Sequence, residues 1–330
     1  MTPPRKRALS GMQPSGRMHL GNLLGALENW KLLQAQYECY FFVADWHALS
    51  TNYADTSHIR EFTRDLLIDW LAAGIDPERS TIFIQSRIPA HAVLHLLLSM
   101  MTPISWLERN PTYKEKQDEI KGKDLGTYGF LGYPVLQAAD ILLYKPDVVP
   151  VGKDQLPHLE LTRELARRFN DIYKTAVFPE PKELLTKFPK VLGTDGRKMS
   201  KSYGNTINLS DTEPVVRQKL KTMVTDPARV RRTDPGNPDI CPVYEFHKIY
   251  STQSVQDQIN KECRTAAIGC IDCKKLVADR IVDRMTPLWE ARAKLTSNPS
   301  HVDDIVQTGS RRAAAVASAT LDEVNAAMNI

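Results

Sequence analysis

The sequence lacks several features, and each absence narrows the class of protein. No apolar run reaches the roughly 18 residues that a membrane-spanning helix needs; the longest candidate, from Ala92 to Met101, is too short and contains His95. The basic segment Arg5-Lys6-Arg7 is not followed by the apolar stretch of a secretory signal peptide. No internal repeat or low-complexity tract is present. We therefore expect a cytoplasmic globular protein with no membrane partner.

Cysteine is scarce, and its placement is uneven. Of five cysteines, Cys39 stands alone in an apolar stretch, where we expect a buried small side chain. The other four are clustered: Cys241, Cys263, Cys270 and Cys273. In a cytosolic chain such clustering favours a metal over disulfides. Only the last two form a short Cys-x2-Cys pair, which is closer to iron–sulfur ligation than to a structural zinc site; zinc and unliganded thiols remain the alternatives.

Length and charge set broad limits. A chain of 330 residues, 42% hydrophobic and 25% charged, can bury a large core and form two domains. The net charge of +4 permits a nucleic-acid partner without demanding one. Basic clusters occur at 5–7, 229–232 and 311–312, and a solvated surface is the alternative reading of each.

Strand and helix patterns alternate along the first part of the chain. Strands are expected at 8–10, 39–44, 81–85 and 148–152, and helices at 20–33, 59–73, 90–107, 135–143 and 156–169. This order predicts an α/β fold with a Rossmann-like parallel sheet. Ligands in such sheets bind at the carboxyl ends of the strands, so the turns after Ser10, Ala44 and Val151 are the places to expect a site.

The character of the sequence changes near residue 205. We expect a catalytic domain over 1–205 and a mostly helical domain over 206–330 that contains the four clustered cysteines. The last helix is expected to pack back on the catalytic domain.

A first candidate phosphate site is the turn that runs from Pro14 to Asn22 and includes His19-Leu20-Gly21-Asn22. The free N–H groups at a helix start attract an anion. His19 can donate to a phosphate oxygen whose charge grows in a transition state, and Gly21 lets a flat adenine or ribose approach the backbone. A capping or surface histidine is the alternative.

A second candidate is Lys198-Met199-Ser200-Lys201-Ser202, bounded by glycines at 193, 196 and 204. Lys198 and Lys201 can clamp a triphosphate and stabilise departing pyrophosphate by electrostatics alone. The glycines allow the loop to move. A solvated basic loop is the alternative.

Together, the order, separation and flanking residues of the two motifs resemble the HIGH and KMSKS signatures of class I aminoacyl-tRNA synthetases. Over essentially its whole length the chain resembles the bacterial tryptophanyl-tRNA synthetases. Further stretches that carry the resemblance are 10–16, 43–50, 83–91, 107–116, 132–144 and 151–170.

The resemblance implies a reaction and a set of ATP-binding residues. The carboxylate of L-tryptophan attacks the α-phosphate of Mg-ATP, pyrophosphate leaves, and the aminoacyl group is transferred to the 3′ end of tRNA(Trp). His19, Lys198, Lys201 and a further phosphate lysine, Lys114, are the implied catalytic residues. The implied ATP-binding residues are Gln13, Pro14, Ser15, Gly21, Asn22, Gly152, Lys153, Asp154, Leu192, Lys198, Met199, Ser200, Lys201 and Ser202.

The amino-acid pocket is expected around Tyr133, Gln137 and Asp140, which share one helix face. A carboxylate in an apolar pocket needs a partner, and an indole N–H is a donor only. Asp140 therefore resembles the family's tryptophan-reading aspartate. Tyr133, Gln137 and Gln155 are placed to bind the α-ammonium group. His47 is expected near the ring, with a core histidine bonded to backbone as the alternative.

Gln137 departs from the pattern, because many bacterial relatives have methionine there. The sister tyrosyl family also uses Gln followed three residues later by Asp, so tyrosine is an alternative substrate. A catalytically silent RNA-binding paralogue and a nucleotidyltransferase of the same superfold are further alternatives. The run at 151–163 and the overall length favour tryptophan.

The resemblance extends to assembly and cofactors. Some bacterial members carry a 4Fe–4S cluster in the helical domain with nearly the cysteine spacing seen here, which implies the same cluster near the bound anticodon. The family is dimeric, and residues 90–130 contain enough apolar helix for a homodimer interface.

Overall fold

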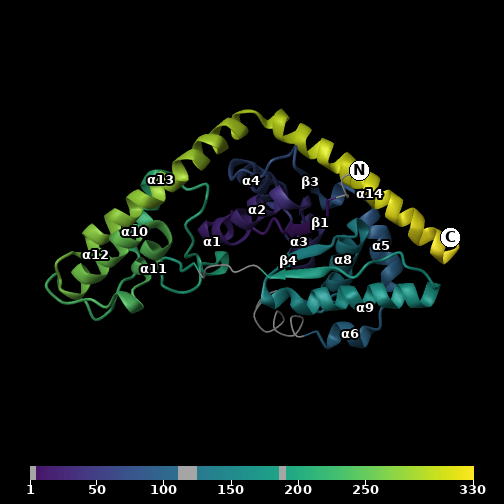
Figure 1. Ribbon diagram of the computed structural model, residues 1–330, viewed down its shortest axis with the longest axis horizontal. Helices are drawn as coiled ribbons and strands as arrows, with labels where there is room; N and C mark the ends of the chain where they lie inside the picture. The colour runs from purple at the N-terminus through teal and green to yellow at the C-terminus, as the bar shows by residue number, and fades with distance from the viewer. Residues whose placement is uncertain (1–4, 111–124, 186–190) are drawn as a thin grey trace.

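The computed structural model describes residues 5–110, 125–185 and 191–330. Its described strands form one parallel five-stranded sheet in the order β3-β2-β1-β4-β5 (Figure 1). The strands are β1 (Arg7–Met12), β2 (Glu38–Val43), β3 (Ser80–Ile84), β4 (Val148–Val151) and β5 (Lys182–Leu185). The predicted parallel α/β fold is confirmed, and the sheet adds β5, whose sequence showed no strand signal.

The strand order reverses at β1, because β2 and β3 lie on one side of it and β4 and β5 on the other. At such a switch point the connections leave in opposite directions and open a crevice at the carboxyl ends of the strands. β2 is buried on both faces from Cys39 onward, as its continuous apolar run predicts. Trp30 stacks on Phe41 with a centroid separation of 4.3 Å, which packs the helix that precedes β2 against this strand.

The helix after β1 is continuous over the predicted span but not uniform. It consists of α1 (Leu20–Asn22), a π-helical segment (Leu23–Leu27) and α2 (Glu28–Gln36). After β2 come α3 (Asp45–Asn52) and α4 (Ile59–Ala72), and Gly74 follows α4 with a φ of 98°, as expected for a glycine that ends a helix.

Two predicted helices have different bounds in the structure. The predicted helix over 90–107 is divided into α5 (Ala90–Ser99) and α6 (Ile104–Glu108), because Pro103 cannot continue a helical hydrogen-bond ladder. The helix predicted to begin near Tyr133 is α8 (Tyr128–Tyr144), in which Pro134 lies inside the helix. The Thr127 side chain accepts a hydrogen bond from the Phe130 backbone N–H and caps the earlier start.

The remaining helices complete the sheet region and the part of the chain beyond the lysine loop. α9 (Leu156–Tyr173) follows β4 and packs against α8. Beyond the loop, α10 (Glu213–Thr222), α11 (Pro242–Tyr250) and α12 (Gln253–Arg264) gather around the first half of α13 (Cys270–Ser297). Figure 1 shows this helical group beside the sheet region.

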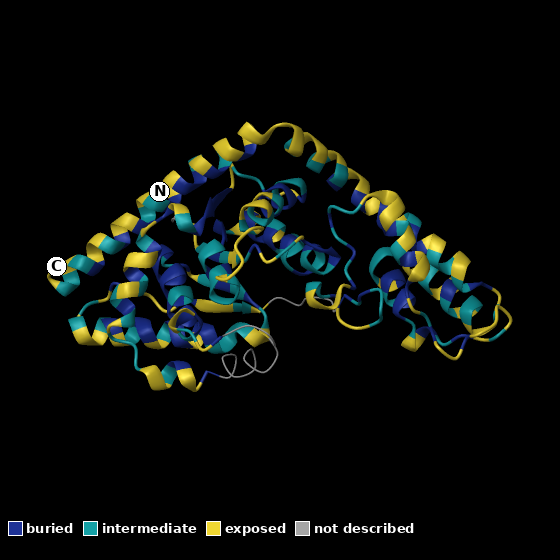
Figure 2. Ribbon diagram, turned by 180° about the vertical axis from the view of Figure 1, so that it is seen from behind, coloured by how far each residue is buried: buried dark blue, intermediate teal, exposed yellow. Residues whose placement is uncertain are grey.

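The two long C-terminal helices form an arch that joins both regions (Figure 1). α14 (Pro299–Met328) follows α13 after Asn298 and packs on β3, α5 and α8. Gly309 permits the close approach, since a Cβ there would lie 1.8 Å from the carbonyl oxygen of Ile82. The Thr320 hydroxyl donates to the carbonyl of Leu143 over 2.8 Å. Figure 2 shows the outer face of the arch exposed and the sheet buried beneath it.

Within the described ranges, no helix is both long and apolar enough to cross a membrane.

Candidate active site

A cavity of about 290 Å³ opens at the switch point, between the carboxyl ends of β1 and β4. Its walls come from the first strand, the turn after β4, and the inner face of α8. Its lining residues are Leu9, Ser10, Gly11, Gln13, Phe42, His47, Tyr133, Gln137, Asp140, Ile141, Val149, Pro150, Val151, Gly152 and Gln155. All five residues expected to select the amino acid therefore lie around one cavity.

Asp140 is the most deeply buried of these groups, with 1% of its surface exposed. Gln85 Nε2 lies 2.8 Å from its Oδ1 and 2.9 Å from its Oδ2, His91 Nδ1 lies 2.6 Å from Oδ1, and His47 Nε2 lies 2.9 Å from Oδ2. Burial raises the pKa of Asp140, but His91 and His47 lower it by more, so the pKa falls to about 2. The cavity therefore presents an ionised carboxylate at neutral pH.

Behind Asp140 lies a polar group that no sequence pattern singled out. His91 Nε2 contacts the Tyr144 hydroxyl over 2.9 Å, and Gln85 Oε1 accepts from the backbone N–H of Trp46 over 3.1 Å. Gln85 and His91 belong to the 83–91 stretch that resembled the family, which was the only available signal for them. Their spatial role depends on contacts with α8, which local sequence does not reveal.

The other expected amino-acid ligands have definite partners. The Tyr133 hydroxyl contacts His158 Nε2 over 2.8 Å, and burial raises its pKa. Gln155 donates to Asp154 Oδ2 over 2.8 Å. His47 contacts the Asp140 carboxylate rather than backbone, so the alternative of a core histidine bonded to backbone does not describe its ring. Gln137 lines the cavity from the same helix face as Asp140.

The first phosphate motif forms a tight helix start beside the cavity. The His19 backbone N–H donates to Asn22 Oδ1 over 3.1 Å, so Asn22 closes the first turn. His19 is 7% exposed, and burial followed by the charge of Lys201 lowers its pKa to about 4. A Cβ at Gly21 would lie 3.0 Å from the His19 ring, so the missing side chain makes room for the imidazole.

The lysine loop folds directly onto this first motif. Lys201 Nζ donates to the carbonyl of Gly16 over 2.8 Å and lies 3.4 Å from Ser15 Oγ. The backbone N–H of Leu20 donates to the carbonyl of Ile207 over 3.0 Å. The two motifs, far apart in sequence, are therefore adjacent in space.

The two lysines of the loop differ in environment. Lys201 is half-buried, and burial lowers its pKa to about 8. Lys198 is exposed, and Met199 between them is 4% exposed and anchored in the core.

Asn205 holds the loop from inside, and sequence reasoning missed it. Its Nδ2 donates to Asp195 Oδ1 over 2.6 Å and to the carbonyl of Lys198 over 3.2 Å, while its Oδ1 accepts from the backbone N–H of Ser200 over 2.8 Å. One buried amide therefore links both ends of the loop.

The remaining predicted ATP ligands flank the cavity on two turns. Gln13, Pro14 and Ser15 follow β1, whereas Gly152, Lys153 and Asp154 follow β4. Leu192 forms an isolated antiparallel bridge with Lys198 at the base of the loop, and Ser202 follows Lys201 in the short turn of the lysine motif. Lys114 lies outside the described residues.

The four clustered cysteines converge at the base of the helical group. Burial first, and then the charges of Cys241, Cys263 and Cys270, raise the pKa of Cys273 to about 12. Arg229 Nη1 lies 3.6 Å from Cys263 Sγ, and Arg229 is itself 9% exposed. Among the described residues, however, no three His, Cys, Asp or Glu side chains stand where they could hold one metal ion. Four thiols are donors that suit a metal, but in this structure their side chains are not arranged around one common point as the predicted ligand set requires.

Comparisons with known proteins agree with this geometry. The family model described as tRNA synthetases class I (W and Y) matches residues 3–286. The tryptophan–tRNA ligase of Thermotoga maritima is 54% identical, with 98% of this chain and 99% of that protein covered. The tryptophan–tRNA ligase of Ralstonia nicotianae is 44% identical, with 98% of each covered.

A solved structure extends the similarity to three dimensions. The tryptophanyl-tRNA synthetase of Campylobacter jejuni in complex with ADP and tryptophan superposes with a TM-score of 0.90 at 30% identity, covering 98% of this chain and 100% of that one.

Proposed function

Because this chain belongs to the class I tRNA synthetases of the tryptophan and tyrosine type, we propose that it activates L-tryptophan with Mg-ATP and transfers it to tRNA(Trp). The observation that carries the proposal is the ionised, buried Asp140 in a cavity at the switch point of the sheet, beside the adjoining histidine and lysine motifs. A carboxylate acceptor suits the indole N–H, which can only donate.

The relatives favour tryptophan over tyrosine, and the buried carboxylate disfavours phenylalanine. The relatives that match the whole chain at 54% and 44% identity are named tryptophan–tRNA ligases. Phenylalanine has no donor on its ring, and binding it would leave the Asp140 carboxylate without its substrate partner, so the cavity rejects it strongly.

The proposed chemistry requires no covalent enzyme intermediate. The substrate carboxylate attacks the α-phosphate in line, and negative charge builds up on the departing pyrophosphate. Lys198 and Lys201 stabilise that charge, and neutral His19 donates one N–H to a phosphate oxygen. A low pKa suits this role, because a neutral imidazole keeps a single proton without adding charge.

We assign the ATP-binding role to the turns after β1 and β4 and to the lysine loop. The proposed residues are Gln13, Pro14, Ser15, Gly21, Asn22, Gly152, Lys153, Asp154, Leu192, Lys198, Met199, Ser200, Lys201 and Ser202. Tyr133, Gln137 and Gln155 are proposed to hold the α-ammonium group, and His47 to flank the ring. We propose that the protein acts in the cytoplasm, where tRNA is charged.

The experiment that tests this function is ATP–pyrophosphate exchange with tryptophan, tyrosine and phenylalanine in parallel. Exchange that depends on tryptophan supports the proposal. Exchange with tyrosine alone would identify the sister activity, and no exchange with any of the three would indicate a silent paralogue. Charging of total tRNA with labelled tryptophan then tests the second step.

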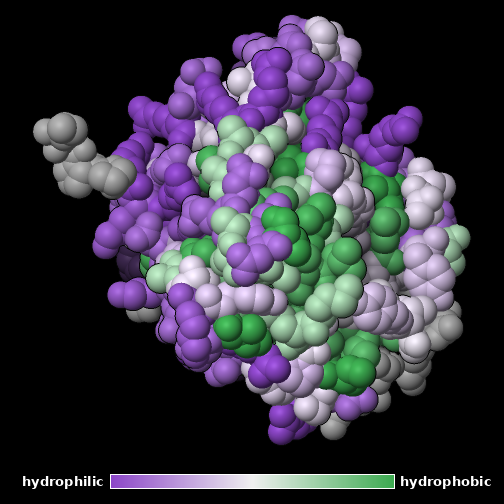
Figure 3. Space-filling model, turned by 90° about the vertical axis from the view of Figure 1, so that its right-hand side faces the viewer, coloured by the Kyte–Doolittle hydropathy of each residue, from purple (hydrophilic) through white to green (hydrophobic). Residues whose placement is uncertain are grey.

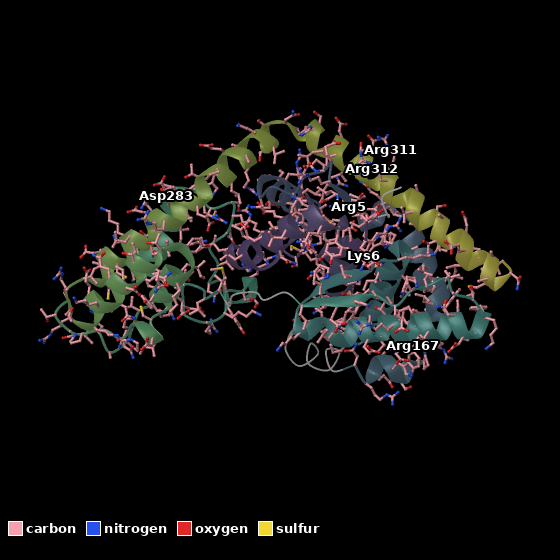
Figure 4. The ribbon with its side chains drawn as sticks, viewed as in Figure 1. Arg5, Lys6, Arg167, Asp283, Arg311 and Arg312 are labelled. Atoms are coloured by element: carbon pink, nitrogen blue, oxygen red, sulfur yellow. The ribbon has the colours of Figure 1, made fainter. Side chains whose placement is uncertain are left out.

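We propose that residues 1–205 form the catalytic domain and residues 206–330 the anticodon-binding domain. Exposed Arg231 and Arg232 adjoin the cysteine set and are available to tRNA phosphates. The other basic clusters are less available: Arg5 donates to the carbonyl of Ala35 over 2.6 Å and Arg312 to that of Pro77 over 3.3 Å. Figure 4 shows Arg311 and Arg312 on α14, on the arch above Arg5 and Lys6.

We further propose that Cys241, Cys263, Cys270 and Cys273 bind a 4Fe–4S cluster, with zinc as the alternative. The clustered thiols lie beside buried Arg229, whose guanidinium is 3.6 Å from Cys263 Sγ and would offset the charge of an anionic cluster. Such a cluster would have a structural role, because the reaction transfers no electrons. Iron and sulfide analysis after anaerobic purification, with zinc measured in the same samples, decides between the two metals. A metal-free protein that charges tRNA normally would contradict both.

A homodimer through α5, α6 and the start of α8 is the proposed assembly. Leu96, Met100, Ile104 and Tyr128 are 53%, 74%, 63% and 68% exposed there. Figure 3, which faces the end of the molecule near α5, shows hydrophobic side chains gathered on the surface. Exposed apolar patches of this kind mark interfaces. Sedimentation of the protein and of a Met100→Glu variant tests the assembly: a dimer that the substitution dissociates supports it, and a monomeric native protein contradicts it.

A further inference from the structure

The Asp140 carboxylate has contacts from the protein interior and from the cavity wall. His91 contacts Oδ1 at 2.6 Å, and Gln85 bridges both oxygens, at 2.8 Å from Oδ1 and 2.9 Å from Oδ2; both residues are 0% exposed. His47, which contacts Oδ2, lines the cavity together with Asp140 itself. Both partners of Oδ1 therefore belong to the protein interior, whereas Oδ2 is shared by interior Gln85 and by His47, which lines the cavity.

His91 is held in turn by Tyr144, one helical turn beyond Asp140 on α8. The Tyr144 hydroxyl lies 2.9 Å from His91 Nε2, and the Tyr144 ring packs against the rings of Tyr40 and Phe83, with centroid separations of 5.2 and 5.3 Å. Burial, followed by the charge of Asp140, raises the pKa of Tyr144, so the hydroxyl keeps its proton. If the phenol donates to Nε2, the imidazole proton resides on Nδ1 and points at Oδ1.

We propose that Tyr144 and His91 are positioning residues for tryptophan selection: Tyr144 holds His91, and His91 binds Oδ1 of Asp140 from behind and so directs Oδ2 toward the indole N–H. Neither residue touches the substrate. The inference rests on the proposed function, because it requires an indole in the cavity. Its physical basis is that an acceptor selects a donor by direction, and a carboxylate that loses its shortest contact, the one from His91, is held less firmly in that direction.

The test compares tryptophan with β-(3-benzothienyl)-alanine, in which sulfur replaces the ring N–H, in pyrophosphate exchange by the full-length protein. For Tyr144→Phe we expect kcat/KM for tryptophan to fall about tenfold, mainly through KM, as the loss of one directed hydrogen bond would give. The analogue should change less than about twofold, because it makes no such bond. The preference for tryptophan over the analogue therefore falls.

Tyr40→Phe is the matched control. It removes a neighbouring buried hydroxyl, which donates to Glu38 over 2.8 Å, without touching the contacts of Asp140. It should leave the preference unchanged. His91→Leu should lose the preference, whereas His91→Asn, whose amide can replace the Nδ1 donor, should recover part of it. Thermal unfolding of each variant establishes that it is folded, and Tyr144→Phe and His91→Asn remain informative if His91→Leu does not fold.

Equal losses for both substrates would mean a merely structural role and would overturn the proposal, as would an unchanged preference in Tyr144→Phe. These outcomes differ from failure of the proposed function, in which the unsubstituted protein shows no exchange with tryptophan. That result would remove both.

Discussion

Lys201, in the loop after β5, donates a hydrogen bond to the carbonyl oxygen of Gly16, in the turn after β1, over 2.8 Å. The contact joins two motifs that lie far apart along the chain. Gly16 has a φ of 133°, which favours glycine, and a Cβ there would lie 3.2 Å from the Lys201 side chain. The position of the lysine therefore depends on the conformation of the first turn.

ATP binding should be coupled to proton uptake through this lysine. Burial lowers the pKa of free Lys201 to about 8, so part of the population is neutral in mildly alkaline solution. Bound phosphates favour the charged ammonium and raise the pKa, so the protein takes up a proton on binding and affinity declines as pH rises above that value. Calorimetry in buffers of different ionisation enthalpy measures the uptake near pH ~8. Lys201→Arg, charged throughout, should show none; equal uptake in both proteins would contradict the assignment.

Asp140→Asn should abolish selective tryptophan activation. The amide presents one acceptor in place of the carboxylate and leaves the buried donors of His91, His47 and Gln85 poorly matched, so we expect kcat/KM for tryptophan to fall by about 10²- to 10³-fold. Asp171→Asn, the same change at an exposed position of α9 away from the cavity, is the control and should retain tryptophan activation. Exchange kinetics measure both; a mild effect of Asp140→Asn would show that another group reads the indole.

Asn205→Ala should slow activation without weakening tryptophan binding. The substitution removes the amide that joins Asp195, Lys198 and Ser200. The loop then samples more conformations, and its lysines spend less time near the phosphates. We expect kcat for exchange to fall about tenfold with KM for tryptophan nearly constant. Fluorescence titration with tryptophan provides the binding control. A matching rise in KM would indicate damage beyond the loop.

Gly309→Ala should lower the stability of the protein by disrupting the packing of α14 on β3. A methyl group would meet the Ile82 carbonyl at 1.8 Å, so helix and strand must separate, at a cost of about 2 kcal/mol or more. Gly129→Ala is the matched control, since Gly129 is also helical and, among the described residues, no atom outside its own helical turn lies within 4 Å of the added methyl; that change should be neutral or stabilising by up to about 1 kcal/mol. Urea unfolding compares them, and equal stability of the two variants would contradict the packing argument.

Sequence patterns predicted the parallel sheet, because strands buried on both faces appear as continuous apolar runs such as that of β2. They did not predict β5, where Lys182–Leu185 is half polar and lies at an edge. They also placed the start of α8 too late, because Pro134 was interpreted as a helix start although the Thr127 cap lies earlier. The edge strand depends on tertiary contacts that a local pattern does not contain, whereas the start of α8 is set by a local cap.

For the site, the sequence by itself determined which functional residues are present: the histidine and lysine motifs, Asp140 on a helix face with Gln137, and four clustered cysteines. Only the tertiary structure decided which of these residues contact one another. It placed Lys201 against Gly16 and enclosed Asp140 between His47, His91 and Gln85. The physical reason is that hydrogen bonds and desolvation act over a few ångströms in space, whatever the separation along the chain, so pKa values and acceptor directions exist only once α8, α3 and β3 have packed together.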